Sequence, residues 1–321
     1  MTINTEMPVR VVAVTQVADK VKRFRFERID GKPMPLFSGG AHIVVSMRDG
    51  DILRRNPYSL MSSPSDVAAY EISVLRVENS RGGSAFLNDK VRTGNELVIS
   101  QPINLFPFDQ RARKHIMMAG GIGITPFMAM MDQMARDGHV CELHYAVRTR
   151  SHGAYWKELQ ARYGAHRVKI YCDEEMLFIP TEAIVGNQPL GTHLYVCGPK
   201  GMIGGVLGQA RKLGWPEQSL HSEEFLAPPI GKPFKAVLQR SHKTIDVQSH
   251  QSILEGVEAA GIDAPYLCRG GACGQCETHV LGCSGKIEHN DHFLEPDEKN
   301  SGKKIMLCVS RISGGDITLD L

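Results

Sequence analysis

The stretch CRGGACGQC, residues 268–276, decides much of what this sequence predicts. Cys268, Cys273 and Cys276 are spaced C-x4-C-x2-C, and a fourth cysteine, Cys308, follows in the segment MLCVSR. This spacing with a distant fourth thiolate is typical of a [2Fe–2S] cluster, whose two irons are held by four cysteines. The glycines between the ligands leave room for backbone N–H groups to point at the cluster sulfurs. We therefore predict that these four cysteines are metal ligands and that the chain carries electrons.

Two other uses of the cysteines are weighed against the cluster. A zinc site also takes four cysteines, but usually as paired C-x2-C hooks. A disulfide scaffold is the remaining alternative. The other cysteines have no metal spacing, and the first three lie in apolar, strand-like runs, so we expect them to behave as small buried hydrophobes. They are Cys141, Cys172, Cys197 and Cys283.

Length and composition narrow the classes of protein that remain. The 321 residues are enough for two or three domains of roughly 100–150 residues each. A net charge of only +2 and the lack of a basic, aromatic-rich stripe argue against nucleic acid as a partner. The N-terminus, MTINTEMPVRVV, has no export signal, and the uncharged stretch 116–131 is shorter than the roughly 20 residues of a membrane helix. We expect a soluble, cytoplasmic protein.

The patterning changes twice along the chain and predicts three domains. Short alternating runs separated by turns predict an antiparallel β-barrel in residues 1–109. Apolar strands that alternate with helical segments predict a doubly wound, parallel α/β domain in residues 110–227. Residues 228–233 are rich in Pro and Gly and are expected to form a linker. Residues 234–321, which carry the cysteine loop, are expected to form a β-grasp domain of the plant-type ferredoxin kind.

Two glycine loops of the middle domain are candidates for nucleotide binding. GGIGITP, residues 120–126, follows a strand and opens a helix, where glycines let phosphates approach the N–H groups of the helix N-terminus. CGPKGM, residues 197–202, joins another strand to another helix. The first loop departs from G-x-G-x-x-G because its last position is Pro126, and a merely tight turn is the alternative. The candidate contacts are Gly120, Gly121, Gly123, Cys197, Gly198 and Pro199.

The choice between NADH and NADPH rests on charges beyond the strands. Asp173 would repel a 2′-phosphate, whereas Arg148 and Arg150 would attract one. The alternative for both arginines is a solvated loop. We predict NADH, with Asp173 in the site.

In the expected barrel, RRNPYSLMSSP (residues 54–64) and NSRGGSAFL (residues 79–87) combine cations, an aromatic ring, hydroxyls and a glycine-serine turn. Such groups can hold a phosphorylated flavin. From the residues alone, surface loops are an equal alternative.

The whole chain resembles the phthalate dioxygenase reductase family of the wider ferredoxin–NADP reductase superfamily. The resemblance covers the flavin barrel, GGIGITP with CGP, and the ferredoxin module, in that order. A cluster module placed last implies FMN rather than FAD. The resemblance also implies that Tyr58 and Ser59 line the flavin ring and ribityl chain, that Val74 and Leu75 lie along the ring, and that a turn holds the phosphate. The turn consists of Gly82, Gly83 and Ser84.

Two further residues are predicted to belong to the site, one from the same resemblance and one from its position in the sequence. Phe225 matches the aromatic residue that closes the nicotinamide face of the flavin, with a core position at a domain boundary as the alternative. Thr125 is our candidate for orienting the nicotinamide or flavin edge. We expect the neighbouring carboxylates Glu223 and Glu224, and the acidic run 173–175, to be surface charges.

One departure from the family pattern concerns the flavin phosphate. Where the family commonly has R-x-Y-S, this chain has Asn56-Pro57-Tyr58-Ser59, with an arginine displaced to Arg55. Either Arg55 reaches the phosphate from one position earlier, or Asn56 replaces the arginine with neutral hydrogen bonds.

These features predict a monomeric, NADH-dependent reductase that passes electrons from NADH to FMN, then to the [2Fe–2S] cluster, and finally to a terminal Rieske-type oxygenase. Nicotinamide gives electrons in pairs and a cluster accepts one, so a flavin between them is required. Similarity to reductases of carnitine-type, demethylating oxygenases hints at the partner. The alternatives are a self-sufficient NADH oxidase or flavin reductase with a regulatory cluster, and a zinc-stabilised interaction module.

Overall fold

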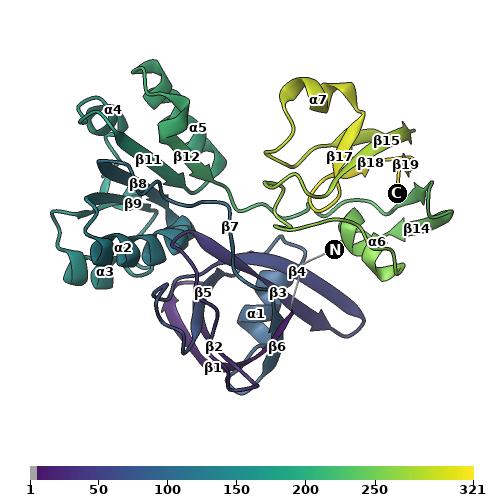
Figure 1. Cartoon of the computed structure of the whole chain (residues 1–321), viewed down its shortest axis with the longest axis horizontal. Helices are drawn as coiled ribbons and strands as arrows, with labels where there is room; N and C mark the ends of the chain where they lie inside the picture. The colour runs from purple at the N-terminus through teal and green to yellow at the C-terminus, as the bar shows by residue number, and fades with distance from the viewer. Residues whose placement is uncertain (1–5) are drawn as a thin grey trace.

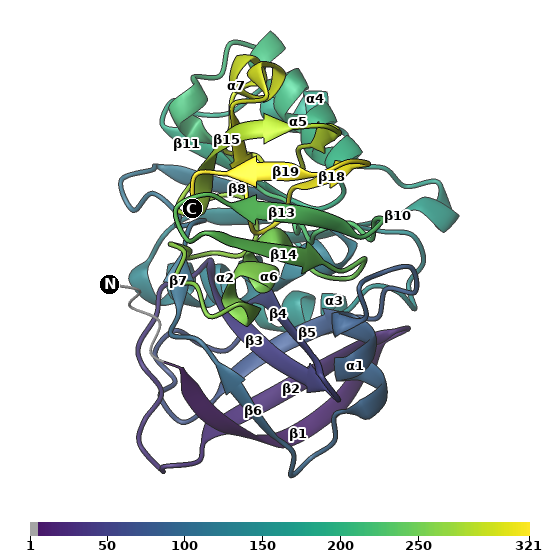
Figure 2. The ribbon, with the colours of Figure 1, turned by 90° about the vertical axis from the view of Figure 1, so that its right-hand side faces the viewer.

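The computed structural model describes residues 6–321, and these build three units in chain order, each around its own sheet (Figure 1). The prediction that the N-terminal stretch holds no export signal falls partly on residues 1–5, which lie outside the described residues. Figure 2 gives a second view of the same arrangement, turned by 90°. Within residues 6–321, no helix has the length and apolar character that crossing a membrane requires.

The first unit is an antiparallel sheet of seven strands that closes around an apolar core. The strand order is β4-β3-β6-β1-β2-β5, with β7 beside β3, as expected for the barrel. The edge position of β4 explains why a strand can contain Pro57, because an edge strand need not donate every N–H group. The elements are β1 (Met7–Ala18), β2 (Val21–Arg28), β3 (Ala41–Asp49), β4 (Ile52–Ser59), β5 (Tyr70–Leu75), α1 (Gly83–Lys90), β6 (Glu96–Ile99) and β7 (Ile103–Asn104).

The second unit is a parallel sheet in the order β10-β9-β8-β11-β12, which runs outward from β8 in both directions. α2 and α3 contribute to the core on one face, while α4 and α5 contribute to the other, as a doubly wound fold requires. The strands are β8 (Lys114–Gly120), β9 (Cys141–Val147), β10 (Val168–Cys172), β11 (Thr192–Cys197) and β12 (Leu220–Glu223). The helices are η1 (Gly121–Ile124), α2 (Thr125–Asp137), α3 (Trp156–Tyr163), η2 (Asp173–Glu175), α4 (Thr181–Val185), α5 (Lys200–Lys212) and η3 (Glu217–Ser219).

The third unit is a mixed sheet in the order β14-β13-β19-β15-β17, in which only β13 and β19 run parallel. The apolar face of α6 packs on this sheet through Ile253, Leu254 and Val257, as in a β-grasp. The strands are β13 (Phe234–Leu238), β14 (Lys243–Val247), β15 (Glu277–Cys283), β16 (Lys286–Glu288), β17 (Lys304–Met306), β18 (Arg311–Ser313) and β19 (Ile317–Leu319). The helices are α6 (Ile253–Ala259) and α7 (Pro296–Ser301).

The three units differ in how they share their cores. Val21, Phe106 and Phe108 of the first unit pack in one apolar cluster with Phe127 and other residues of the second. The apolar core of the third unit is made only of residues from 234 onward. The first two units are therefore joined by hydrophobic packing, whereas the third keeps a core of its own.

Candidate redox site

The loop that carries three of the cysteines follows α6, and Cys308 lies in the turn after β17. The thiols of Cys268 and Cys273 lie within hydrogen-bonding reach of each other, as do those of Cys276 and Cys308. The backbone N–H of Gly270 donates to Cys268 Sγ over 3.4 Å. The loop and this turn together bring all four predicted ligands close to one another as two pairs.

This pairing suits two metal ions better than one. A structural zinc site surrounds one ion with four ligands. A [2Fe–2S] cluster takes four thiolates for two irons, and two thiol pairs can supply them. All eight cysteines are free, which argues against a disulfide scaffold.

The electrostatics of the pairs also suit metal binding. The hydrogen bond with Cys273 lowers the pKa of Cys268 to about 5, and the hydrogen bond with Cys308 lowers the pKa of Cys276. In each pair the partner's pKa is raised, since the shared proton stays on that thiol. In each pair one thiol therefore loses its proton more easily than a free cysteine, and the thiolate is the form that binds metal.

Two glycines of the loop are required by close packing. A Cβ atom at Gly271 would lie 2.7 Å from Val309 Cγ2, and one at Gly274 would lie 2.3 Å from the ring of Phe293. Both glycines also have positive φ angles, 74° and 76°. The glycine-rich composition of the loop thus follows from its tight fit against residues 291–309.

A cavity of about 440 Å³ lies between β4, β5, α1 and the chain that leaves the second unit. It brings together nine of the residues predicted to contact flavin or nicotinamide: Asn56, Tyr58, Ser59, Val74, Leu75, Gly83, Ser84, Thr125 and Phe225. Its apolar strand residues and polar turn match a molecule with a flat ring and a phosphate tail. Its lining does not include Arg55 or Gly82.

Arg55 and Asn56 point to opposite sides of β4, because successive residues of a strand alternate. Arg55 points to the third unit, where its Nη1 lies 3.0 Å from Glu258 Oε2. Asn56 faces the cavity and accepts a hydrogen bond of 3.1 Å from Arg81 Nη2. Arg81 is not among the residues predicted from the sequence, although its position directly before the Gly-Gly-Ser turn is a signal for it.

A larger cleft of about 1030 Å³ opens at the carboxyl ends of β8 and β11, the switch point of the parallel sheet. It is lined by eight of the predicted residues: Leu75, Gly120, Gly121, Gly123, Asp173, Gly198, Pro199 and Phe225. Cys197 is completely buried behind it, and its carbonyl oxygen would lie 2.2 Å from a Cβ atom at Gly123. Gly123 is therefore a point of contact between the two loops.

The two arginines near this cleft differ in whether they are free to bind a 2′-phosphate. Arg148 lines the cleft, but Arg150 is held by Glu175 through hydrogen bonds of 2.6 and 2.7 Å. Asp173 lies in the cleft lining. Thr125 is placed in the flavin-sized cavity instead, where its Oγ1 donates to the carbonyl of Ile122 over 3.0 Å.

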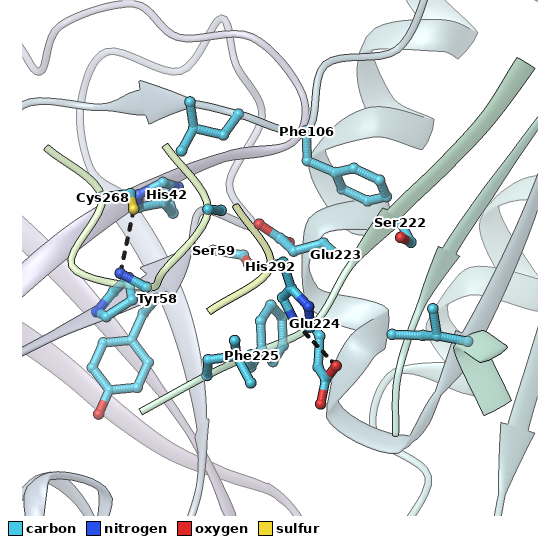
Figure 3. A pocket seen from close by; sticks show the side chains of 16 residues that line it. His42, Tyr58, Ser59, Phe106, Ser222, Glu223, Glu224, Phe225, Cys268 and His292 are labelled. Carbon is cyan, nitrogen blue, oxygen red and sulfur yellow. Dashed lines mark hydrogen bonds and ion pairs between the residues drawn. The ribbon is translucent and has the colours of Figure 1, made fainter. Parts of the chain in front are cut away.

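A third cavity, of about 240 Å³, lies where all three units meet (Figure 3). The barrel contributes Tyr58 to its lining, the parallel-sheet unit contributes Phe225, and the cluster loop contributes Cys268. Phe225 lines all three cavities, and Tyr58 lines two of them. The nucleotide cleft, the flavin-sized cavity and the cluster loop thus share their walls.

The expectation that Glu223 and Glu224 are surface charges is wrong. Glu224 Oε2 lies 3.1 Å from Nε2 of His292 in the third unit, and Figure 3 shows the two side chains facing each other. Glu223 Oε2 is buried without a hydrogen-bond partner. Burial raises the pKa of Glu223 to about 8. Glu223 ends β12 and Glu224 follows it, at a place where the packing of the three units shields both side chains in part from solvent. The acidic run 173–175 is exposed, as expected.

Glu223→Gln is expected to change the pH dependence of stability. The folded state holds the Glu223 proton up to about pH 8, but the unfolded chain releases it near 4.5, so wild-type stability falls as pH rises between these values. The effect is at most about 1.4 kcal/mol per pH unit, and smaller where solvent reaches the carboxyl. Thermal midpoints measured from pH 5 to 8 should show the variant gaining on wild type. Exposed Glu174→Gln is the control, and a parallel pair of curves for Glu223→Gln would contradict the expectation.

Comparisons with known proteins agree with this arrangement. Residues 236–313 match the family model of the 2Fe-2S iron-sulfur cluster binding domain, and residues 97–220 match that of the dimethylamine monooxygenase subunit DmmA-like N-terminal domain. The carnitine monooxygenase reductase subunit of Acinetobacter baumannii is 43% identical over 98% of each chain. The heme-dependent oxidative N-demethylase beta subunit of Ectopseudomonas mendocina is 40% identical over 99% of this chain and 100% of its own.

A solved structure shows the same architecture over nearly the whole chain. It is that of phthalate dioxygenase reductase, described as a modular structure for electron transfer from pyridine nucleotides to [2Fe–2S]. It superposes with a TM-score of 0.90 at 31% identity and covers 99% of this chain and 98% of its own. The protein is an oxidoreductase that passes electrons to a terminal oxygenase. The chain belongs to the phthalate dioxygenase reductase family.

Proposed function

We propose that electrons run from NADH through FMN to a [2Fe–2S] cluster on Cys268, Cys273, Cys276 and Cys308, and leave for a terminal Rieske-type oxygenase of a methylated amine such as carnitine. The cavity lined by Tyr58, Phe225 and Cys268 carries this proposal, because the proposed flavin and cluster sites share its wall. Bound FMN would accept a hydride's electron pair and release it in single steps. The carnitine monooxygenase reductase relatives support the choice of amine.

The chain's own residues hold and separate the carriers in this proposal. Tyr58, Ser59, Val74 and Leu75 line the flavin ring and ribityl chain, while Gly83 and Ser84 face the phosphate. Asn56 and Arg81 meet that phosphate in place of Arg55, which is committed to Glu258. Phe225 covers the flavin from the nucleotide cleft, and Thr125 shapes the edge where nicotinamide arrives. Gly120, Gly121, Gly123, Gly198 and Pro199 accept the dinucleotide, with Cys197 behind them.

The proposed division into domains follows the three sheets. The flavin barrel takes residues 1–109, the NAD-binding domain takes 110–227, the linker takes 228–233, and the ferredoxin domain takes 234–321. We also propose a monomer in the cytoplasm, since eight free cysteines suit a reducing compartment.

Asp173→Asn is expected to admit NADPH. The carboxylate of Asp173 lies in the cleft lining, while Glu175 occupies Arg150, so the wild-type site repels a 2′-phosphate. Removing one negative charge should raise kcat/KM for NADPH by roughly tenfold, about 1.4 kcal/mol, and leave that for NADH within a few-fold. Steady-state kinetics with both nucleotides measures this ratio, and Glu174→Gln is the control. An unchanged ratio would show that Asp173 does not face the 2′ position.

An anaerobic titration tests the main proposal. The purified protein should show flavin and iron–sulfur absorbance, and both should bleach with NADH. Adding a purified carnitine-type oxygenase should then reoxidise the cluster. A protein without flavin absorbance, or a cluster that NADH leaves oxidised, would refute the electron path. Rapid oxygen consumption by the protein alone, unchanged by any oxygenase, would favour the NADH oxidase alternative.

A heme-dependent amine oxygenase is the second candidate for the partner. The heme-dependent N-demethylase subunit, 40% identical over its full length, favours it. The match of residues 97–220 to the dimethylamine monooxygenase family model supports an amine substrate for either candidate. The two candidates share an amine substrate and differ in the metal centre that receives the electron. Reoxidation kinetics with one purified oxygenase of each kind would decide between them.

A further inference from the structure

Helix α6 presents two carboxylates to the barrel. Glu255 and Glu258 are three positions apart, so they lie on one face of the helix. Glu255 Oε2 lies 2.6 Å from Arg81 Nη1, and Glu258 Oε2 lies 3.0 Å from Arg55 Nη1. Figures 1 and 2 both place α6 beside β4. The third unit, whose core is separate, is thus held to the first by two ion pairs.

The Arg81–Glu255 pair is rigid and dry. The two side chains are only 4% and 6% exposed. Glu255 also accepts the N–H of Ser252 over 2.8 Å as part of the capping box that begins α6. Because the same carboxylate fixes the start of the helix, it cannot move away from Arg81 without disturbing α6. A buried pair of this kind is costly to break from one side, since it leaves a buried charge unpaired.

Arg81 keeps donors for a second task. A guanidinium has five N–H donors. Arg81 uses them toward Glu255, the carbonyl of His250 at 3.2 Å and Asn56 Oδ1 at 3.1 Å, whereas its Nε is buried without a partner. The side chain also lines the flavin-sized cavity beside Gly83 and Ser84.

Among the buried side chains near the Gly83–Ser84 end of the flavin-sized cavity, positive charge exceeds negative charge. Arg311 is completely buried, and its guanidinium bonds to the backbone carbonyls of Gln251 and Lys232. Burial and the charge of Arg81 lower the pKa of Arg311. Two buried cations thus lie near one buried carboxylate, Glu255, while Glu288, the other carboxylate that acts on Arg311, is exposed to solvent. A phosphate dianion at the Gly83–Ser84 turn would balance them.

The second ion pair, Arg55–Glu258, also contacts the cluster loop. Glu258 receives hydrogen bonds from Arg55 and also from Arg269, whose Nη1 lies 3.1 Å away. Arg269 directly follows the ligand Cys268, and its guanidinium lies 3.9 Å from the ring centroid of Tyr266. This contact explains why the arginine of the barrel motif stands at position 55: it holds α6 and the cluster loop rather than the flavin.

We propose that Arg81 is a positioning residue shared by two units: it fixes the iron–sulfur unit on the barrel through Glu255, and it holds the phosphate end of the flavin with its remaining donors. The two tasks use different N–H groups, so flavin binding and docking stabilise each other rather than compete. Arg55 and Glu258 form a second, flavin-independent clamp. This inference rests on the proposed FMN site.

The test compares FMN affinity in full-length, deflavinated variants by quenching of flavin fluorescence. Glu255→Gln touches no flavin atom, yet it should raise the FMN dissociation constant by about tenfold, within the usual range for coupled sites. Arg81→Lys, which keeps the charge but loses the planar fork, should raise it as well. Glu298→Gln is the matched control, because Glu298 holds the same capping-box position in α7 and pairs with Lys304 instead of the barrel.

Small-angle X-ray scattering measures how closely the third unit docks on the barrel, which a purely local change at the flavin site would leave unaltered. Addition of FMN should reduce the radius of gyration of the deflavinated wild type. The same addition should leave the radius of gyration of Glu255→Gln unchanged. An unchanged FMN affinity in Glu255→Gln, or an equal loss in Glu298→Gln, overturns the shared role of Arg81. Failure of the wild type to bind FMN at all would instead refute the proposed function, so the two failures are distinguishable.

Discussion

Cys308→Ser is expected to abolish cytochrome c reduction while sparing the reduction of ferricyanide by NADH. Cys308 is the distant member of the Cys276–Cys308 pair, and substitution leaves one iron short of a thiolate. Even neighbours of metal ligands cost 10–100-fold in metal affinity, so loss of a ligand should cost at least about 100-fold in single-electron transfer. Ferricyanide takes electrons from the flavin and should keep most of its rate.

Cys283→Ser is the matched control for this prediction. Cys283 lies in the same unit at the end of β15, and its thiol donates to the carbonyl of Gly285 rather than to another cysteine. The control should retain both activities and the iron–sulfur absorbance. Loss of ferricyanide reduction together with cytochrome c reduction in Cys308→Ser would contradict the relay order in which flavin precedes the cluster.

Gly123→Ala is expected to disrupt the nucleotide cleft more than any other single methyl group we consider. The new Cβ atom would lie 2.2 Å from the carbonyl oxygen of Cys197 and 2.6 Å from its carbonyl carbon, so the two glycine loops must separate. Overpacking of this kind costs about 1–3 kcal/mol, which corresponds to roughly 10–100-fold in KM for NADH if the strain falls on the cleft.

The control is Gly204→Ala in the neighbouring helix α5. A Cβ atom there meets no atom within 4 Å, and alanine favours the helix. Its KM for NADH should stay close to that of wild type. FMN content should be unchanged in both variants, since neither lies in the flavin-sized cavity. A wild-type KM in Gly123→Ala would show that the loops adapt without loss of function.

The features that the sequence predicted well depend on local signals. The cysteine spacing, the alternating runs and the two glycine loops each involve residues close together in the chain, and the structure places them as expected. Pro126 falls in the first turn of α2, and Gly138 ends that helix with a φ angle of 79°. Other elements have weaker local signals, because Pro57 interrupts the alternating pattern of β4 and α1 opens with glycine.

The features that sequence reasoning missed depend on contacts between distant segments. Arg81 and Glu255 are separated by 174 positions, and Arg55 and Glu258 by 203. The burial of Glu223 arises only where three sheets meet, so a local reading of two adjacent carboxylates predicts exposure. The residues Asn56 and Arg55 also illustrate this limit, because strand register decides which of them faces the cavity.

The separate core of the third unit has a consequence for how such chains evolve. Because the barrel and the parallel-sheet unit share apolar packing, they form one packed body to which the third unit is added. A unit attached through ion pairs and a short linker can be gained, lost or moved along the chain without repacking a core. Substitutions on its outer surface can then alter docking to an oxygenase without disturbing the packing that forms the nucleotide cleft.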